Sequence, residues 1–220
     1  MAARSYRQFC ALAFALDVVG ERWTLLIVRE LLAGPRRFTD LLDGLPGISP
    51  NLLSERLKRL EQQGLLVRRA LPPPAASAVY DLTEFGRGLE PALLALGRWG
   101  SRRLPASLDG VAPPSAGAMA LAIKAFFRPE QAQNETAVYE LHLDSEVLQV
   151  RVVDGTIDIR QGQAREADAV FRTSMDVFVG LFAGQIAPDD AMVQGLIQVE
   201  GNPAALSRFL ALSRVSGEGA

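Results

Sequence analysis

The sequence predicts a mixed fold with a helix-rich first domain over residues 1–104 and an α+β second domain over residues 118–214. In the first part, apolar residues recur at the spacing of amphipathic helices. In the second, apolar and polar residues alternate as in strands, and helices follow the strands, which is typical of an α+β domain with an antiparallel sheet. Residues 105–117 are rich in Pro, Gly, Ala and Ser and are therefore predicted to be a linker.

The charge of the chain is unevenly divided between these two parts. Residues 1–104 contain 15 Lys and Arg against 10 Asp and Glu, a net charge of +5, whereas residues 105–220 contain 8 against 15, a net charge of −7. Only the first part is therefore expected to bind a polyanion.

Composition also indicates the compartment. No apolar run approaches the length of a membrane span, and the N-terminus lacks the apolar stretch of a secretory signal. Cys10 is the single cysteine, which excludes an intrachain disulfide and fits a reducing environment. We therefore expect a cytoplasmic protein that does not enter a membrane.

Four predicted elements follow one another within residues 34–82. A short helix has Arg36 and Arg37 at its start, a turn leads to a second helix capped by Ser49, and a hairpin follows over residues 66–82. This order is the layout of a winged helix-turn-helix, which presents one helix to the major groove of DNA.

The second of these helices has two distinct faces. Three leucines recur at i, i+4 and i+7, so they are expected to face the core: Leu53, Leu57 and Leu60. The opposite face carries side chains that can bond to base edges and phosphates: Asn51, Ser54, Glu55 and Lys58. An ordinary solvated helix face fits this helix equally well, and the hairpin that follows favours the DNA interpretation.

The hairpin is predicted from two short strands, residues 66–70 and 79–82, joined by a stiff Pro-rich tip over residues 71–78. Arg68 and Arg69 stand at its base, where positive charge suits a phosphate backbone. The alternative is that these arginines only keep the hairpin soluble.

Two further helices flank this unit. Residues 9–19 are apolar almost all round, which predicts a helix packed between other elements. A longer helix is predicted from Thr83 to about Arg103, with an apolar stripe that suits either a dimer seam or an intrachain core: Leu89, Leu93, Leu96 and Trp99.

Residues 6–103 resemble the HxlR-type family of bacterial transcription regulators. The resemblance rests on Cys10 and on the runs 16–27, 34–38, 45–50, 56–57, 60–61, 64–65 and 80–86. It implies a homodimer on double-stranded DNA, with the helix from Ser49 in the major groove, a wing along the backbone and an inverted-repeat operator. The residues that it implies for DNA binding are Arg36, Arg37, Ser49, Asn51, Ser54, Glu55, Lys58 and Arg69.

Some members of that family sense oxidants through a cysteine near the N-terminus, and Cys10 occupies the matching position. Ala11 follows it where relatives commonly have proline, and no second cysteine is present to close an intrachain disulfide. We therefore interpret Cys10 as a small buried hydrophobic residue and assign no redox switch.

The second domain is predicted to begin with a helix over residues 116–127. Strands at 139–143, 147–153, 156–160 and 169–173 follow, then helices near 174–182 and 188–192, a strand at 197–201 and a helix at 203–212. Asp154 and Gly155 form the turn of a hairpin.

Several short motifs here resemble the sterol-carrier-protein-like domain over residues 118–214: residues 153–157, 167–173, 184, 189–191, 195 and 199–203. The resemblance implies an apolar cavity for a hydrophobic molecule. Its candidate lining is aromatic and Met side chains, which suit an adaptable pocket: Phe126, Phe127, Phe171, Met175, Phe178, Phe182, Met192 and Phe209. They equally suit a filled core, and the domain also occurs as a packing or dimerisation module.

An enzyme is not expected. His142 is the one histidine and alternates with apolar strand residues, and neither a Gly-rich phosphate loop nor a Gly-x-Ser-x-Gly motif is present. We expect no metal and no cofactor. The favoured hypothesis is a transcription regulator controlled by a hydrophobic effector in the second domain. The alternatives are a hydrophobic-metabolite binder with DNA binding secondary, or a regulator whose second domain is only a dimer brace.

Overall fold

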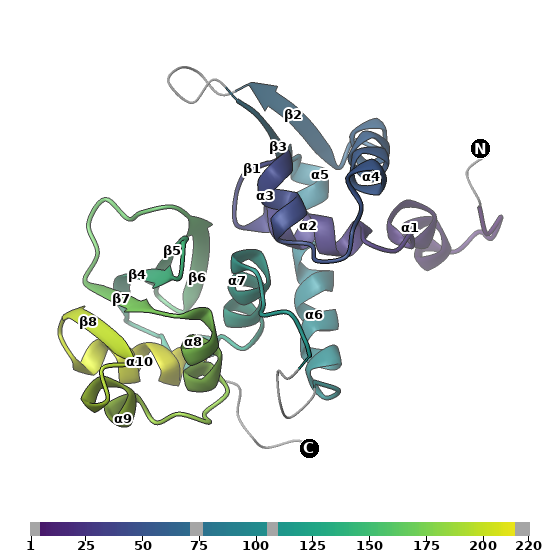
Figure 1. Ribbon diagram of the computed structural model, residues 1–220. Coiled ribbons are helices and arrows are strands. Elements are labelled where there is room, and N and C mark those ends of the chain that lie inside the picture. The colour runs from purple at the N-terminus through teal and green to yellow at the C-terminus, as the bar shows by residue number, and fades with distance from the viewer. Residues whose placement is uncertain (1–4, 71–76, 105–109, 214–220) are drawn as a thin grey trace. The chain divides into compact units, whose positions relative to one another are not determined.

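The computed structural model describes residues 5–70, 77–104 and 110–213, and the chain forms two compact units, residues 1–91 and 92–220 (Figure 1). The boundary between the units lies inside the helix Glu90–Ser101. The domain bounds 1–104 and 118–214 remain a prediction from the sequence. Residues 105–109 of the predicted linker, residue 214 of the predicted second domain and residues 71–76 of the predicted hairpin tip lie outside the described residues. None of the helices in the described ranges has the length and apolar character that crossing a bilayer requires.

The first unit is a set of short helices with a three-stranded antiparallel sheet in the order β1-β3-β2. Its elements are α1 (Ala11–Val19), α2 (Thr24–Leu32), β1 (Arg36–Arg37), α3 (Phe38–Asp43), α4 (Pro50–Gln62), β2 (Leu66–Ala70), β3 (Ala78–Leu82) and α5 (Glu84–Arg87). Their apolar faces form one core that includes Ile27, Leu31, Leu41, Leu53, Leu57, Leu60, Leu65 and Leu82. The predicted winged helix-turn-helix is confirmed.

The start of α3 differs from the prediction. Arg36 and Arg37 do not belong to the helix but form β1, opposite Tyr80 and Val79 of β3. Their backbone groups pair with a strand that lies more than forty residues later, and no local pattern reveals such a pairing. The helix therefore begins at Phe38.

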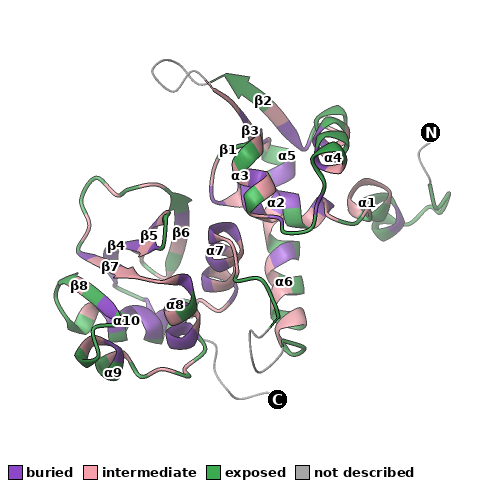
Figure 2. Cartoon of the chain, viewed as in Figure 1, coloured by how far each residue is buried: buried purple, intermediate pink, exposed green. Residues whose placement is uncertain are grey.

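The helix α1 is more exposed than the sequence indicated. Only Ala13 of α1 is buried, and much of the helix is exposed (Figure 2). Leu12 and Phe14 are 67% and 58% exposed. Phe9 and Cys10, just before the helix, are exposed as well. The predictions of a helix packed between other elements and of a buried cysteine are therefore wrong, because none of the described elements covers these side chains.

The predicted single helix from Thr83 to Arg103 is two helices, α5 and α6 (Glu90–Ser101). Thr83 caps α5, its Oγ1 accepting from the backbone N–H of Gly86 at 3.1 Å. Pro91 has no N–H to donate to the carbonyl of Arg87, so a continuous helix loses a bond at this point. Gly88 therefore follows the last residue of α5, and the next helix, α6, begins at Glu90.

The second unit contains a five-stranded sheet in the order β6-β5-β4-β7-β8. Besides most of α6, its elements are α7 (Ala116–Ala125), a 3-10 turn η1 (Pro129–Gln131), β4 (Thr136–Leu143), β5 (Glu146–Val153), β6 (Thr156–Gln161), β7 (Ala169–Thr173), α8 (Met175–Phe182), α9 (Pro188–Val193), β8 (Ile197–Gly201) and α10 (Ala204–Ser213). The predicted hairpin turn is confirmed: Asp154 and Gly155 have φ of 45° and 75°, as a tight turn with two left-handed residues requires.

The sheet is mixed, and the prediction of a purely antiparallel sheet is wrong. The strands β4 and β7 pair in parallel, with Tyr139 opposite Ala169. The connection over residues 162–168 therefore crosses from β6 at one edge, past β5, to the far side of β4. Three hydrogen bonds to β4 hold this crossover. The N–H of Ala164 donates to the Glu140 carboxylate at 2.7 Å, Asp168 Oδ2 accepts from the N–H of Val138 at 2.7 Å, and the N–H of Asp168 donates to the Val138 carbonyl at 2.8 Å.

The core of the second unit is an aromatic cluster. Tyr139, Phe171, Phe178, Phe182, Phe209 and Phe126 form a connected series with ring centroids 5.1–6.5 Å apart. Of the eight residues predicted to line a cavity, five are buried: Phe171, Met175, Phe178, Phe182 and Phe209. The other three are partly exposed: Phe126, Phe127 and Met192. In this arrangement the rings contact one another, as in a filled core.

Tyr139 joins this cluster to a buried polar group that the sequence did not reveal. Its hydroxyl donates to Glu135 Oε1 at 3.1 Å, and Arg208 Nε lies 2.7 Å from the same oxygen. Burial, and then the nearby Glu135 carboxylate, raise the pKa of Tyr139 well above its ordinary value. The hydroxyl therefore stays a hydrogen-bond donor throughout the physiological pH range.

Phe209→Ala tests the aromatic cluster as the main packing centre of the second unit. Because Phe209 is 1% exposed and contacts three other rings, we expect the loss of about 3–5 kcal/mol in the free energy of unfolding of this unit. Urea denaturation followed by circular dichroism measures it. Val193→Ala is the matched control, since Val193 is 87% exposed. Equal effects of the two substitutions would contradict the assignment.

Candidate nucleic-acid interface

The start of α4 is fixed by its own sequence. Ser49 precedes the helix in an extended conformation, and its Oγ accepts from the N–H of Leu52 at 3.3 Å. Pro50 occupies the first turn, where a missing N–H costs nothing. One side of the helix is then held by burial, with Leu53, Leu57 and Leu60 at most 2% exposed.

The opposite side of α4 is open to solvent (Figure 2). Asn51, Ser54, Glu55 and Lys58 are all exposed and lie at i, i+3, i+4 and i+7, so they form one stripe along the helix. This stripe carries an amide, a hydroxyl, a carboxylate and an ammonium group, which together offer both donors and acceptors.

Ion pairs hold the edge of α4. Glu21, just before α2, lies 3.3 Å from Arg56 Nη2 through Oε2 and 3.2 Å from Arg59 Nη1 through Oε1. Arg59 Nη2 also donates to the main-chain oxygen of Asp17 at 3.5 Å. These contacts were not predicted, and the i, i+3 spacing of the two arginines is the one sequence signal that indicates a shared partner.

The hairpin β2–β3 projects away from the helices of the first unit (Figure 1). Arg68 and Arg69 are exposed on β2, opposite Tyr80 and Val79. Arg69 also lies 3.4 Å from the buried carboxylate of Asp81, which is bound more closely by Arg87 at 2.5 Å. Because Arg69 is 61% exposed, this pair is weak and leaves most of the guanidinium accessible.

The two arginines before α3 lie in different surroundings. Arg37 is exposed, and its N–H donates to Asp40 Oδ2 at 3.0 Å at the start of α3. Arg36 is 3% exposed and therefore lies in the interior of the unit. The accessible surface contains seven of the eight residues predicted for DNA: Arg37, Ser49, Asn51, Ser54, Glu55, Lys58 and Arg69.

Each part of the chain matches a known protein family. Residues 18–107 match the HxlR-like helix-turn-helix model, and residues 124–213 match that of the SCP-2 sterol transfer family. The uncharacterized HTH-type transcriptional regulator YvaP of Bacillus subtilis is 38% identical over 96 residues, which are 43% of this chain and 89% of YvaP. The chain belongs to the HxlR-like helix-turn-helix family.

Other relatives of this HxlR-like protein match the same region. The HTH-type transcriptional regulator YodB of Bacillus subtilis is 38% identical over 39% of this chain and 76% of YodB. The solved structure of the reduced form of YodB aligns over 43% of this chain and 94% of that chain, with 34% identity and a TM-score of 0.39. These relatives are transcriptional regulators rather than enzymes.

Proposed function

We propose that this HxlR-like protein is a transcription regulator that reads its operator with the exposed stripe of α4. The observation that carries the proposal is this stripe, Asn51, Ser54, Glu55 and Lys58, on the outward side of the second helix of a helix-turn-helix. The opposite side is buried, so the helix has one face left to offer to DNA.

Each side chain of the stripe suits a different contact. Asn51 can form two hydrogen bonds with adenine, Glu55 can accept from the amino group of cytosine, and Lys58 can donate to guanine or to a phosphate. Ser54 can bond to several bases. Ser49 positions the helix through its cap, and the first-turn N–H groups of α4 favour a phosphate.

Arg37 and Arg69 supply sequence-independent contacts in this proposal. Both guanidinium groups are exposed at the edges of the first unit, where they can neutralise backbone phosphates. Arg36 is left out because its buried side chain does not reach the surface.

The homodimer belongs to the same proposal. On α1 and just before it, Phe9, Leu12 and Phe14 are exposed, and α6 exposes Leu96 and Trp99. Exposed large apolar side chains mark interaction sites, and a second copy would cover those of α1 and, separately, those of α6. A two-fold dimer would place two α4 helices on an inverted repeat.

Lys58→Gln tests the DNA-binding stripe. We expect weaker binding to DNA from upstream of the protein's own gene, and a slope of log K against log salt that is smaller by about 1, because one phosphate or base contact is lost. Fluorescence anisotropy over a salt series measures both. Arg165→Gln removes the same charge from an exposed site in the second unit and should leave the slope unchanged. Wild-type binding to scrambled DNA as tight as to the upstream fragment would contradict the proposal.

Phe14→Glu tests the dimer. A charge on the exposed face of α1 opposes apolar burial against a second copy, so sedimentation velocity should show monomers where the wild type is dimeric. Val193→Glu, at an exposed site on α9, should remain dimeric. A monomeric wild type, or a variant that remains dimeric, would count against this interface.

A second candidate function is hydrophobic-ligand binding by the second unit, which the match to the SCP-2 sterol transfer family favours. The aromatic cluster must open for a ligand to enter, since its rings now contact one another. The partly exposed Phe126 and Phe127, next to the end of α7, are the side chains that can move at least packing cost. A ligand that favours the open form would shift the population of the unit and could control DNA binding.

Native mass spectrometry of the purified protein tests this function. We expect a co-purifying apolar molecule, or a rise in melting temperature with one member of a fatty-acid and sterol panel, because a ligand that binds only the folded state stabilises it. Phe178→Trp should reduce the shift, since a larger ring narrows the space between Phe182 and Phe209. No bound molecule and no shift would favour the dimer brace instead.

A further inference from the structure

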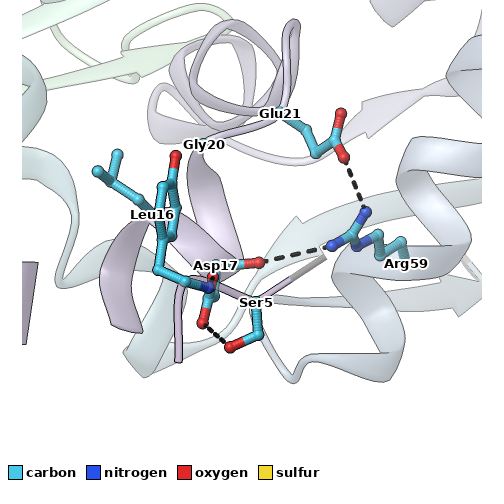
Figure 3. Close-up of a pocket in the computed structure, with 7 residues that line it drawn as sticks. Ser5, Leu16, Asp17, Gly20, Glu21 and Arg59 are labelled. Carbon is cyan, nitrogen blue, oxygen red and sulfur yellow. Dashed lines mark hydrogen bonds and ion pairs between the residues drawn. The ribbon is translucent and has the colours of Figure 1, made fainter. Parts of the chain in front are cut away.

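A cavity of about 310 Å³ lies in the first unit, beside Arg59 in the last turn of α4 (Figure 3). Its walls come from the N-terminal segment, the end of α1, the residues before α2 and one residue of α4. They are Ser5, Tyr6, Leu16, Asp17, Gly20, Glu21 and Arg59. The volume is at the lower end of the range for small-molecule sites.

Asp17 holds the N-terminal segment over this cavity. Ser5 Oγ donates to Asp17 Oδ2 at 2.7 Å, and the N–H of Tyr6 donates to Asp17 Oδ1 at 3.0 Å. Tyr6 and Leu16, 58% and 39% exposed in the single chain, place an aromatic ring and an aliphatic side chain at the edge of the cavity. The cavity thus combines an apolar side with a carboxylate.

The two carboxylates of the lining, Asp17 and Glu21, differ in their partners. Glu21 is paired with Arg56 and Arg59, whereas Asp17 receives its two hydrogen bonds from neutral donors. Among the residues that the structure describes, no Lys or Arg side chain forms an ion pair with the Asp17 carboxylate. A ligand with one positive charge would supply the Asp17 carboxylate with the ionic partner that these residues do not give it, in a place partly shielded from water.

We propose that this cavity binds a small organic monocation with an aromatic or aliphatic body, and that its binding weakens the hold of the protein on DNA. The ammonium group lies against Asp17 and Glu21, and the apolar body lies against Tyr6 and Leu16. This is a ligand site in the DNA-binding unit itself, separate from the SCP-2-like unit.

Arg59 connects the cavity to the DNA-reading helix. Its guanidinium spans Glu21 and the main-chain oxygen of Asp17, and it belongs to the last turns of α4 (Figure 3). A cation beside Glu21 competes with Arg59 for the same carboxylate, so one of the two ion pairs that hold α4 to the residues before α2 weakens. This step rests on the proposed function, because it assumes that α4 reads DNA.

The binding step is tested with 2-phenylethylammonium and its neutral analogue 2-phenylethanol, by calorimetry on the full chain without DNA. We expect the cation to bind at least about 5-fold more tightly, and Asp17→Asn to abolish the preference. Asp43→Asn removes the same charge from an exposed site on α3 that does not line the cavity, and it should keep the preference. Absent or equal binding of the two compounds, or a preference that survives in Asp17→Asn, would overturn the proposal.

The coupling step uses the upstream DNA fragment at constant ionic strength, with sodium chloride replacing the ligand salt in the control. We expect saturating 2-phenylethylammonium to weaken DNA binding by about 5-fold or more in the wild type and not in Asp17→Asn. Cation binding with unchanged DNA affinity would overturn the regulatory half of the proposal. Failure of the wild type to prefer the upstream DNA without ligand would instead reject the proposed function and leave the calorimetric result standing.

Discussion

The burial of one face of α4 determines how the first unit can act. Leu53, Leu57 and Leu60 lie in the core, so the rotation of the helix about its own axis is fixed and its polar stripe must face outward. A rotation by one residue would turn the helix by about 100° and bring charged groups toward the core, at a cost that the apolar burial forbids. The cap at Ser49 fixes where the helix begins, and the ion pairs of Glu21 fix its edge. Recognition of bases requires a helix held in one position, because a loosely held helix would bring its side chains to several different positions along the DNA.

Much of this arrangement could be predicted because its causes are local. The cap at Ser49, the leucine spacing of α4 and the turn at Asp154 and Gly155 each depend on a few neighbouring residues. The failures share a different cause, since each depends on a partner distant in the sequence. Arg36 was predicted to face DNA, and pairing of β1 with β3 buries it. The parallel pairing of β4 and β7 depends on a crossover that the alternating pattern of the strands does not encode.

The exposed face of α1 is the most informative of these differences. A nearly continuous apolar helix predicts that its side chains are buried. The pattern identifies apolar side chains, but it does not indicate whether the same chain or another chain covers them. Exposed Leu12 and Phe14 would each leave apolar area in water that a second copy can remove, at about 25 cal/mol per Å². Apolar side chains that a partner chain would cover thus have the same pattern in a sequence as core side chains, and only the folded structure distinguishes the two.

The two units differ in how a ligand could act on them. In the second unit, entry into the aromatic cluster must separate rings that are packed at 5.1–6.5 Å, so a ligand there has to replace contacts that already stabilise the fold. In the first unit the cavity beside Arg59 already exists, and a cation meets Asp17 and Glu21 without parting a core. A small differential affinity then suffices, because a ligand shifts an equilibrium only by the difference in its binding to the two states. In the proposal the two states differ in the ion pair between Arg59 and Glu21. Arg59 belongs to the helix with the polar stripe, and its partner Glu21 lines the cavity.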